Sequence, residues 1–166
     1  MVTVSEAMAK MIEYSEGSRH DIDHFMKVWA YAKTIGELEH LDEQTQKTLE
    51  LAAIVHDIAC PSLRETHGSA PGNLQEQYGP PLVREFFADS DIDAAMLDRI
   101  CYLVSRHHTF KDVNGMDYQI LLEADFLVNA GEDEKYLRAV SHFRENVFKT
   151  KTGTRLLNSV YRENHP

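Results

Sequence analysis

The sequence has few cysteines and no long apolar run, and both shortages restrict where the protein is expected to work. Its 166 residues include two cysteines, Cys60 and Cys101, too few for a disulfide framework, so we expect both thiols to be buried as small hydrophobic groups. Apolar runs such as Leu51–Val55 are far shorter than the ~20 residues that span a bilayer. Residues 1–6 lack the basic and then apolar pattern of a signal peptide. We therefore expect a cytoplasmic protein without a membrane partner.

Positive charge is also scarce. The chain has 17 Lys and Arg residues against 27 Asp and Glu residues, a formal net charge of −10 at pH 7. Such a field repels polyanions, so we expect no nucleic-acid polymer as a partner. A small phosphorylated molecule remains compatible with this charge if metal ions supply local positive charge. The sequence contains no P-loop, no G-x-G-x-x-G and no Cys-x-x-Cys motif.

Apolar residues recur at helical spacing, and no segment alternates convincingly with period two over the length of a strand. Thr3 and Glu6 form the capping-box pattern that opens a first helix. We therefore predict a single all-α domain over residues 1–166. The predicted helices are 3–17, 21–38, 42–57, one that begins at 79–81, one that Asp91 caps and that ends at 107–108, then 117–130, 132–148 and 153–162, with 61–73 as a loop rich in Pro, Gly and Ser.

The pair His56–Asp57 ends the apolar helical run 49–55. Two ligand-type side chains at the end of a buried helix are unfavourable unless something binds them, because an uncompensated buried carboxylate destabilises the fold or shifts its own pKa. A divalent metal ion removes that penalty. The pair therefore indicates a metal site.

Four further residues are candidate ligands of this site. Asp125 projects from a mainly apolar helical face, where a charged residue is rarely buried without a partner, and a salt bridge to Arg or Lys is the alternative. His24 lies in the first turns of its predicted helix. His107 and His108 end a helix and point about 100° apart, so one can face the core while the other reaches along the same cavity. Their alternatives are a satisfied core histidine for His107 and an interaction with the helix dipole for His108.

The pattern His24, His56-Asp57 and Asp125 resembles the HD-domain superfamily of metal-dependent phosphohydrolases, over about residues 20–130. The resemblance implies an all-helical bundle in which these four residues hold one metal ion, with the terminal helices packed on it. His107-His108 resembles the segment that binds a second ion in some members. Gln75-Glu76 resembles the position where a His or Glu completes that second site, and His67 is a rival to Glu76.

The resemblance also implies a reaction, the hydrolysis of a small phosphate ester or anhydride that is nucleotide-like. Asp57 has two carboxylate oxygens and could bridge two ions roughly 3.5–4 Å apart. Mixed imidazole and carboxylate ligands suit Fe, Mn, Co, Ni or Zn, with Mg as a further option. We expect Asp57 and Glu76 to be catalytic, Glu76 by orienting the water or protonating the leaving oxygen. Lys27 and Arg106 are the candidates for binding substrate phosphate.

One departure and two alternatives accompany this interpretation. Many HD proteins have Gly and Lys shortly after the pair, whereas this chain has Ile58-Ala59-Cys60-Pro61 and so lacks a phosphate-neutralising lysine there. A mixed-valent di-iron oxygenase has a similar ligand set and would bind iron and consume oxygen. A non-catalytic regulatory module that binds metal and nucleotide would keep the metal as a structural element and would be stabilised by a nucleotide without turning it over.

Overall fold

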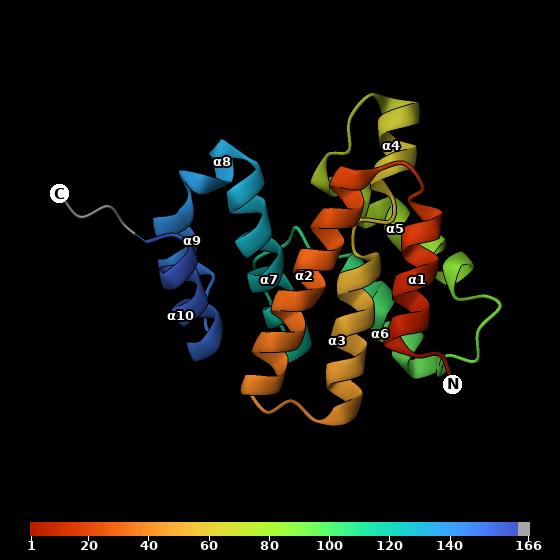
Figure 1. The fold of residues 1–166 in the computed structure, drawn as a ribbon, viewed down its shortest axis with the longest axis horizontal. Helices are drawn as coiled ribbons and strands as arrows, with labels where there is room; N and C mark the ends of the chain where they lie inside the picture. The colour runs from red at the N-terminus through yellow and green to blue at the C-terminus, as the bar shows by residue number, and fades with distance from the viewer. Residues whose placement is uncertain (163–166) are drawn as a thin grey trace.

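The computed structural model describes residues 1–162 and builds them from helices, with no strand in that range, which confirms the predicted all-α fold. In chain order the helices are α1 (Val4–Tyr14), α2 (Arg19–Leu38), α3 (Glu43–Val55), α4 (Cys60–His67), α5 (Gly72–Phe86), α6 (Ala94–Val104), α7 (Met116–Glu132), α8 (Glu134–Leu137), α9 (Val140–Asn146) and α10 (Lys151–Val160) (Figure 1). None of these helices is long and apolar enough to cross a membrane.

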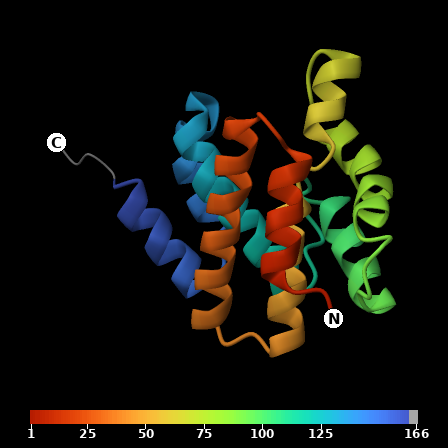
Figure 2. The same cartoon turned by 45° about the vertical axis from the view of Figure 1, so that its right-hand side comes forward.

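Helices α2, α3 and α7 pack against one another and form the centre of the bundle. Every residue of α3 from Thr48 to Val55 is buried, and α7 is buried along most of its length. α1 and α6 cover α3, while α5 packs on α6 (Figure 2). α8 and α10 pack against α7 on the opposite side of the molecule (Figure 1). The long central helices therefore bring residues far apart in the sequence onto facing, buried surfaces.

Side-chain caps set several helix starts. The Thr3 hydroxyl accepts a hydrogen bond from the Glu6 amide (3.1 Å), and the Glu6 carboxylate accepts one from the Thr3 amide (2.9 Å), which confirms the capping box. The cap of α6 differs from the prediction, because Asp93 accepts from the Met96 amide (3.0 Å). Asp91 instead lies 2.8 Å from the amino group of Met1 and so holds the start of the chain against the α6 end.

The predicted loop 61–73 holds only for residues 68–71, and the predicted helix start at 79–81 is wrong. Residues 60–67 form α4. Pro61 is compatible with this helix because it lies in the first turn, where the missing proline N–H removes no helical hydrogen bond. Gly68 ends α4 in the left-handed region (φ 77°). α5 then begins at Gly72 and contains Pro80 and Pro81 in its interior. These prolines cannot donate backbone hydrogen bonds within α5, which packs against α6.

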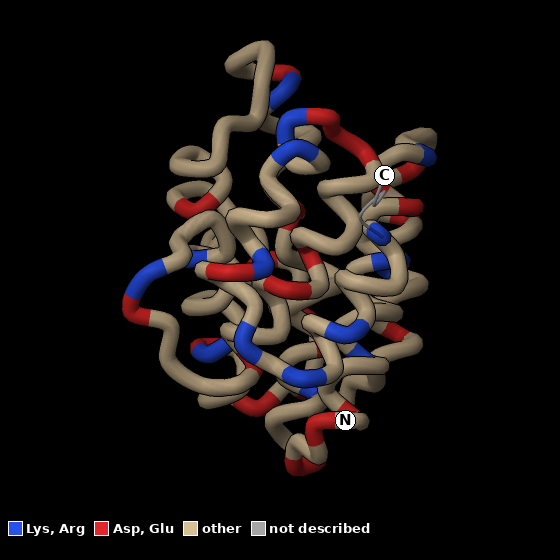
Figure 3. Tube along the Cα trace, turned by 90° about the vertical axis from the view of Figure 1, so that its left-hand side faces the viewer, with Lys and Arg blue, Asp and Glu red and all other residues tan. Residues whose placement is uncertain are grey.

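The C-terminal part also differs from the prediction, since 132–148 is interrupted rather than one helix. Asp133 has extended backbone angles (φ −135°, ψ 121°), which end α7, and its side chain accepts from the Lys135 amide (2.9 Å) to cap α8. Figure 3 shows the face formed by this part of the chain, on which acidic and basic positions are interspersed. Positive charge is therefore not gathered into one stripe on that face.

Candidate metal centre

The candidate ligands lie on two central helices and in the turns that follow α3 and α6. His24 lies in the second turn of α2, and Asp125 lies near the middle of α7. His56 is the C-cap of α3, and Asp57 follows it in the turn that leads to α4. His107 and His108 lie in the turn after α6 rather than inside that helix.

The first group of donors gathers around His24. Its Nε2 atom lies 3.1 Å from Oδ2 of Asp57, 3.2 Å from Oδ1 of Asp125 and 3.2 Å from Nε2 of His56. Nε2 of His56 is in turn 3.3 Å from the same oxygens of Asp57 and Asp125. The four residues that the sequence places in one site therefore meet in the structure.

The second group uses the other oxygen of Asp57. Oδ1 of Asp57 lies 3.3 Å from Nε2 of His107. Oε1 of Gln75 lies 3.0 Å from that nitrogen and 2.8 Å from Nε2 of His108. Single donor atoms of Asp57, His107 and His108 lie within 4.8 Å of one another, as do those of Asp57, His56 and His24. Asp57 is thus shared by two groups, each of a size that can hold one ion.

Hydrogen bonds on the far side of each imidazole fix its orientation. Nδ1 of His56 lies 2.6 Å from the Ala53 carbonyl oxygen, and Nδ1 of His107 lies 2.7 Å from the Val104 carbonyl oxygen. A carbonyl oxygen can only accept, so Nδ1 carries a proton in both residues and Nε2 points inward, where it offers a lone pair once the ring is neutral. His24 has the same arrangement, with Nδ1 2.9 Å from Oε2 of Glu132.

The charges of the first group stabilise one another. Burial opposes the protonated form of His24, but hydrogen bonds to Asp125, Asp57 and Glu132 raise its pKa overall. Burial has the same effect on His56, where the charges of Asp57 and Asp125 raise the pKa to about 10. Although burial alone would raise the pKa of Asp125, its histidine partners hold that pKa well below the usual range. Both carboxylates of this group are therefore ionised at neutral pH and able to bind a cation.

His108 has a different environment from His24 and His56. Burial and the neighbouring His107 lower the pKa of His108 to about 4, so its imidazole is neutral at physiological pH. A neutral imidazole is the form that binds a metal ion. Neutral imidazole nitrogens and carboxylate oxygens facing one another at 3.1–3.3 Å repel unless protons or a cation lie between them. The donor chemistry of both groups fits divalent transition-metal ions.

The comparisons with known proteins agree with this geometry. The family model described as HD domain matches residues 21–146, which include every residue of both donor groups. The chain belongs to the HD-domain family. Members of this family bind divalent metal ions, and the His and Asp groups described above can hold them.

The HD fold is also present in a solved structure. A crystal structure described as a predicted HD superfamily hydrolase, from an uncultured Thermotogales bacterium, has a TM-score of 0.71 and 22% sequence identity. The match covers 95% of this chain and 84% of that one, so the terminal helices are included in the shared fold. Among curated proteins, no relative matches the sequence.

Three sequence-predicted site residues lie elsewhere. Oε2 of Glu76 accepts from the His108 amide (3.0 Å) and the Thr109 hydroxyl (2.8 Å), so Glu76 braces the histidine turn and its neighbour Gln75 faces the donors. Lys27 is exposed and lines a cavity of about 410 Å³ at α2 and Leu156 of α10. The guanidinium of Arg106 lies 5.6 Å and 5.8 Å from two tyrosine ring centroids, those of Tyr102 and Tyr118.

His67, the rival to Glu76, is also outside the donor groups. It ends α4 and is exposed, and its ring centroid lies 6.2 Å from that of Tyr78 on α5. Within residues 1–162, the side chain whose oxygen contacts both His107 and His108 is Gln75, and neither Glu76 nor His67 takes that position.

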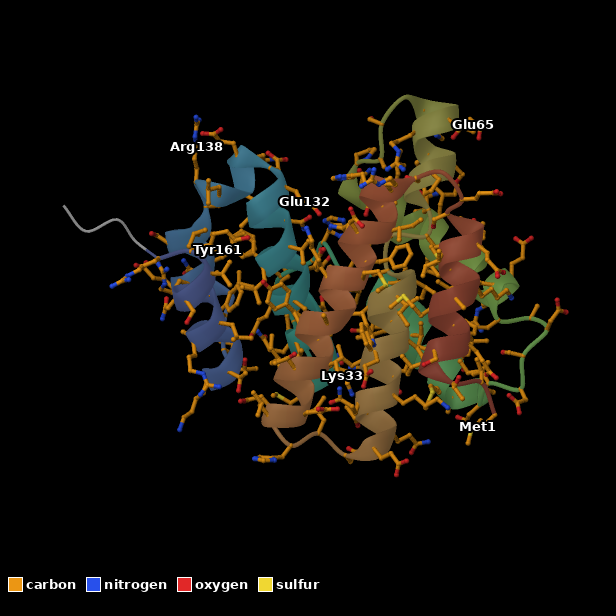
Figure 4. The ribbon with its side chains drawn as sticks, in the orientation of Figure 1. Met1, Lys33, Glu65, Glu132, Arg138 and Tyr161 are labelled. Carbon is orange, nitrogen blue, oxygen red and sulfur yellow. The ribbon has the colours of Figure 1, made fainter. Side chains whose placement is uncertain are left out.

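Two residues of the site were not predicted as ligands or partners. The resemblance includes Gln75 only as the neighbour of Glu76. Glu132 lies at the end of α7 that faces the first turns of α2 (Figure 4). The sequence does contain a signal for Glu132, because residues seven apart share a helix face and Glu132 follows Asp125 by seven.

Proposed function

We propose that the protein is a metal-dependent phosphohydrolase that cleaves a small phosphate ester or anhydride, with a nucleotide-like substrate. One observation carries the proposal. Oδ2 of Asp57 faces His24 and His56 while Oδ1 of the same carboxylate faces His107. A carboxylate shared between two imidazole groups suits a pair of ions that act on one phosphoryl group.

Ions bound by such donors supply a water of lowered pKa as nucleophile and neutralise charge on the phosphoryl oxygens. The protein residues supply the positioning. The imidazoles of His56 and His107 are fully buried, whereas the side chain of Asp57 is 28% exposed. A substrate therefore approaches from the side of Asp57, and the buried rings behind it exclude further water. Hydrogen bonds from Nδ1 to fixed carbonyl oxygens keep both rings from rotating during the reaction.

The test compares two aspartate variants. Asp57→Asn removes the shared charge with little change in volume, while Asp23→Asn changes an exposed aspartate of α2 next to His24. We expect Asp57→Asn to lose bound metal, measured by inductively coupled plasma mass spectrometry, and to lose hydrolysis of an aryl phosphate. We expect Asp23→Asn to retain both. The same assay across nucleotides with Mn²⁺, Co²⁺, Ni²⁺, Zn²⁺ and Mg²⁺ then defines the substrate and the active ion.

Three results contradict the proposal. Hydrolysis by protein freed of metal would remove its basis. Bound iron with an intervalence absorption band and oxygen consumption would favour an oxygenase instead. Thermal stabilisation by a nucleotide, without turnover of any phosphate ester or anhydride, would favour a regulatory binding module.

A further inference from the structure

Gln75 is a buried amide whose orientation is fixed. It lies in the first turn of α5, and 8% of the residue is exposed. Its Nε2 donates to the Ala70 carbonyl oxygen at 2.6 Å. Because an amide that donates on one side presents its oxygen on the other, Oε1 is directed at the two histidines.

Two oxygen acceptors converge on Nε2 of His107. Nε2 of His107 lies 3.0 Å from Oε1 of Gln75 and 3.3 Å from Oδ1 of Asp57. Nδ1 of His107 donates to the Val104 carbonyl, so with a single proton on the ring Nε2 is a third acceptor facing two oxygens. Three converging acceptors in a buried place repel one another, and a shared cation turns that repulsion into attraction.

The surrounding structure holds Gln75 in place. A Cβ atom at Gly72, one turn earlier in α5, would lie 2.8 Å from Cγ of His108, so glycine lets the start of α5 contact that ring directly. Glu76, next to Gln75, accepts from the His108 amide. α5 and the histidine turn are therefore fixed to each other on both sides of Gln75.

We propose that Oε1 of Gln75 is a protein ligand of the second cation, together with Asp57, His107 and His108. This inference rests on the proposed function, because it concerns the second ion of the same site. The first group contains two carboxylates, Asp57 and Asp125, whereas the second contains the shared carboxylate and a neutral amide. Ligand charge raises the affinity for a divalent ion. The two ions therefore bind with unequal affinity, the second more weakly, and the second is the exchangeable one.

The experiment changes the charge of one side chain. Chelator-treated protein is titrated with Mn²⁺ or Co²⁺ by isothermal titration calorimetry, and bound metal is counted by mass spectrometry. The wild type binds two equivalents of unequal affinity. Gln75→Ala weakens the second equivalent by at least ~10-fold and leaves the first unchanged. Gln75→Glu, which adds a charge at the same position, tightens the second equivalent by ~10-fold or more.

Gln77, which is exposed on α5, provides the matched control. Gln77→Ala and Gln77→Glu leave both equivalents unchanged, and circular dichroism verifies that every variant is folded. Equal weakening of both equivalents in Gln75→Ala, or no tightening in Gln75→Glu, overturns the assignment of Gln75. A wild type that binds one equivalent and hydrolyses phosphate overturns this inference but keeps the proposed function. A protein that binds no metal overturns both.

Discussion

Glu132→Ala tests how the protein prepares His24 for metal binding. Oε2 of Glu132 accepts from Nδ1 of His24 at 2.9 Å, and the side chain of Glu132 is 20% exposed. This bond keeps the proton on Nδ1, turns Nε2 toward Asp57 and Asp125, and increases the basicity of the ring. Removing the carboxylate removes the acceptor that holds the proton on Nδ1, so the other tautomer becomes accessible.

The size of the effect follows from the geometry. A hydrogen bond to a charged group contributes about 1.5–3 kcal/mol, and a partly accessible carboxylate belongs toward the lower end of that range. Each 1.4 kcal/mol is a factor of ten in an equilibrium constant, so the first metal ion should bind about 10–100-fold more weakly. Loss of an outer hydrogen-bond partner of a ligating histidine has effects of the same order. Glu132→Gln keeps an oxygen acceptor and should show a smaller loss.

Metal affinity is measured by competition with a chromogenic chelator, and ¹⁵N NMR of the histidine rings reports the tautomer of His24. Glu134→Ala is the control, because Glu134 is two residues away, is highly exposed and pairs with Arg138. We expect the control to retain wild-type affinity. The reasoning is refuted if Glu132→Ala binds the first ion as tightly as the wild type, or if affinity falls while the Nδ1-protonated tautomer persists.

Three further predictions concern stability. Glu123→Ala removes a fully buried carboxylate that accepts from Thr150 Oγ1 (2.6 Å), the Thr150 amide (3.1 Å) and Gln119 (2.6 Å). The free energy of unfolding, measured by urea denaturation, should fall by about 3–5 kcal/mol. The exposed control Glu145→Ala should leave it unchanged. Gly79→Ala places a Cβ 2.6 Å from Cγ1 of Val104 and should lower stability by about 1–3 kcal/mol in the same assay. In chelator-treated protein, His56 has its pKa raised from 6.5 to about 10, so its stabilising effect is complete below pH 6.5 and is lost as the pH rises toward 10. Melting temperatures that are constant over that range would contradict this.

The first donor group could be predicted from sequence because burial and charge conflict at its residues. His56 and Asp57 end an apolar helical run and Asp125 projects from an apolar helical face, and a buried ionised group needs a partner. The resemblance, which has a His or Glu at this position, favours Glu76 over Gln75, but helix phase decides which of the two faces the histidines. Successive residues of a helix point about 100° apart, so the start of α5 decides which of the two faces His107. Because the sequence predicts a loop over residues 61–73, it does not give the residue at which α5 begins, and so it does not give the directions of Gln75 and Glu76.

The start of α5 was predicted wrongly because of Pro80 and Pro81, which lie inside that helix. Pro at the start of a helix and Pro inside it have the same local signature, and only packing distinguishes them. Gly79 precedes Pro80 and lets α5 approach Val104 of α6 closely, an interaction between segments 25 residues apart in sequence (79 and 104). Lys27 and Arg106 show that closeness to a ligand in sequence does not place a charged side chain in the site. Both are close to ligands in sequence, yet Arg106 lies on tyrosine rings and Lys27 on the α10 side of α2.

His56 and Asp57 can have different roles because α3 ends at Val55, just before this pair. His56 keeps helical angles as the C-cap, so its ring points into the bundle and is fully buried. Asp57 follows in the turn, where its side chain is partly exposed and its two oxygens face different groups of histidines. A helix that continued through Asp57 would fix both side chains to one helical surface about 100° apart. The end of α3 therefore makes one carboxylate reachable by both donor groups and by a substrate, which is why a change at Asp57 should affect both metal binding and hydrolysis, whereas a change at Gln75 should affect only the second ion and the reactions that need it.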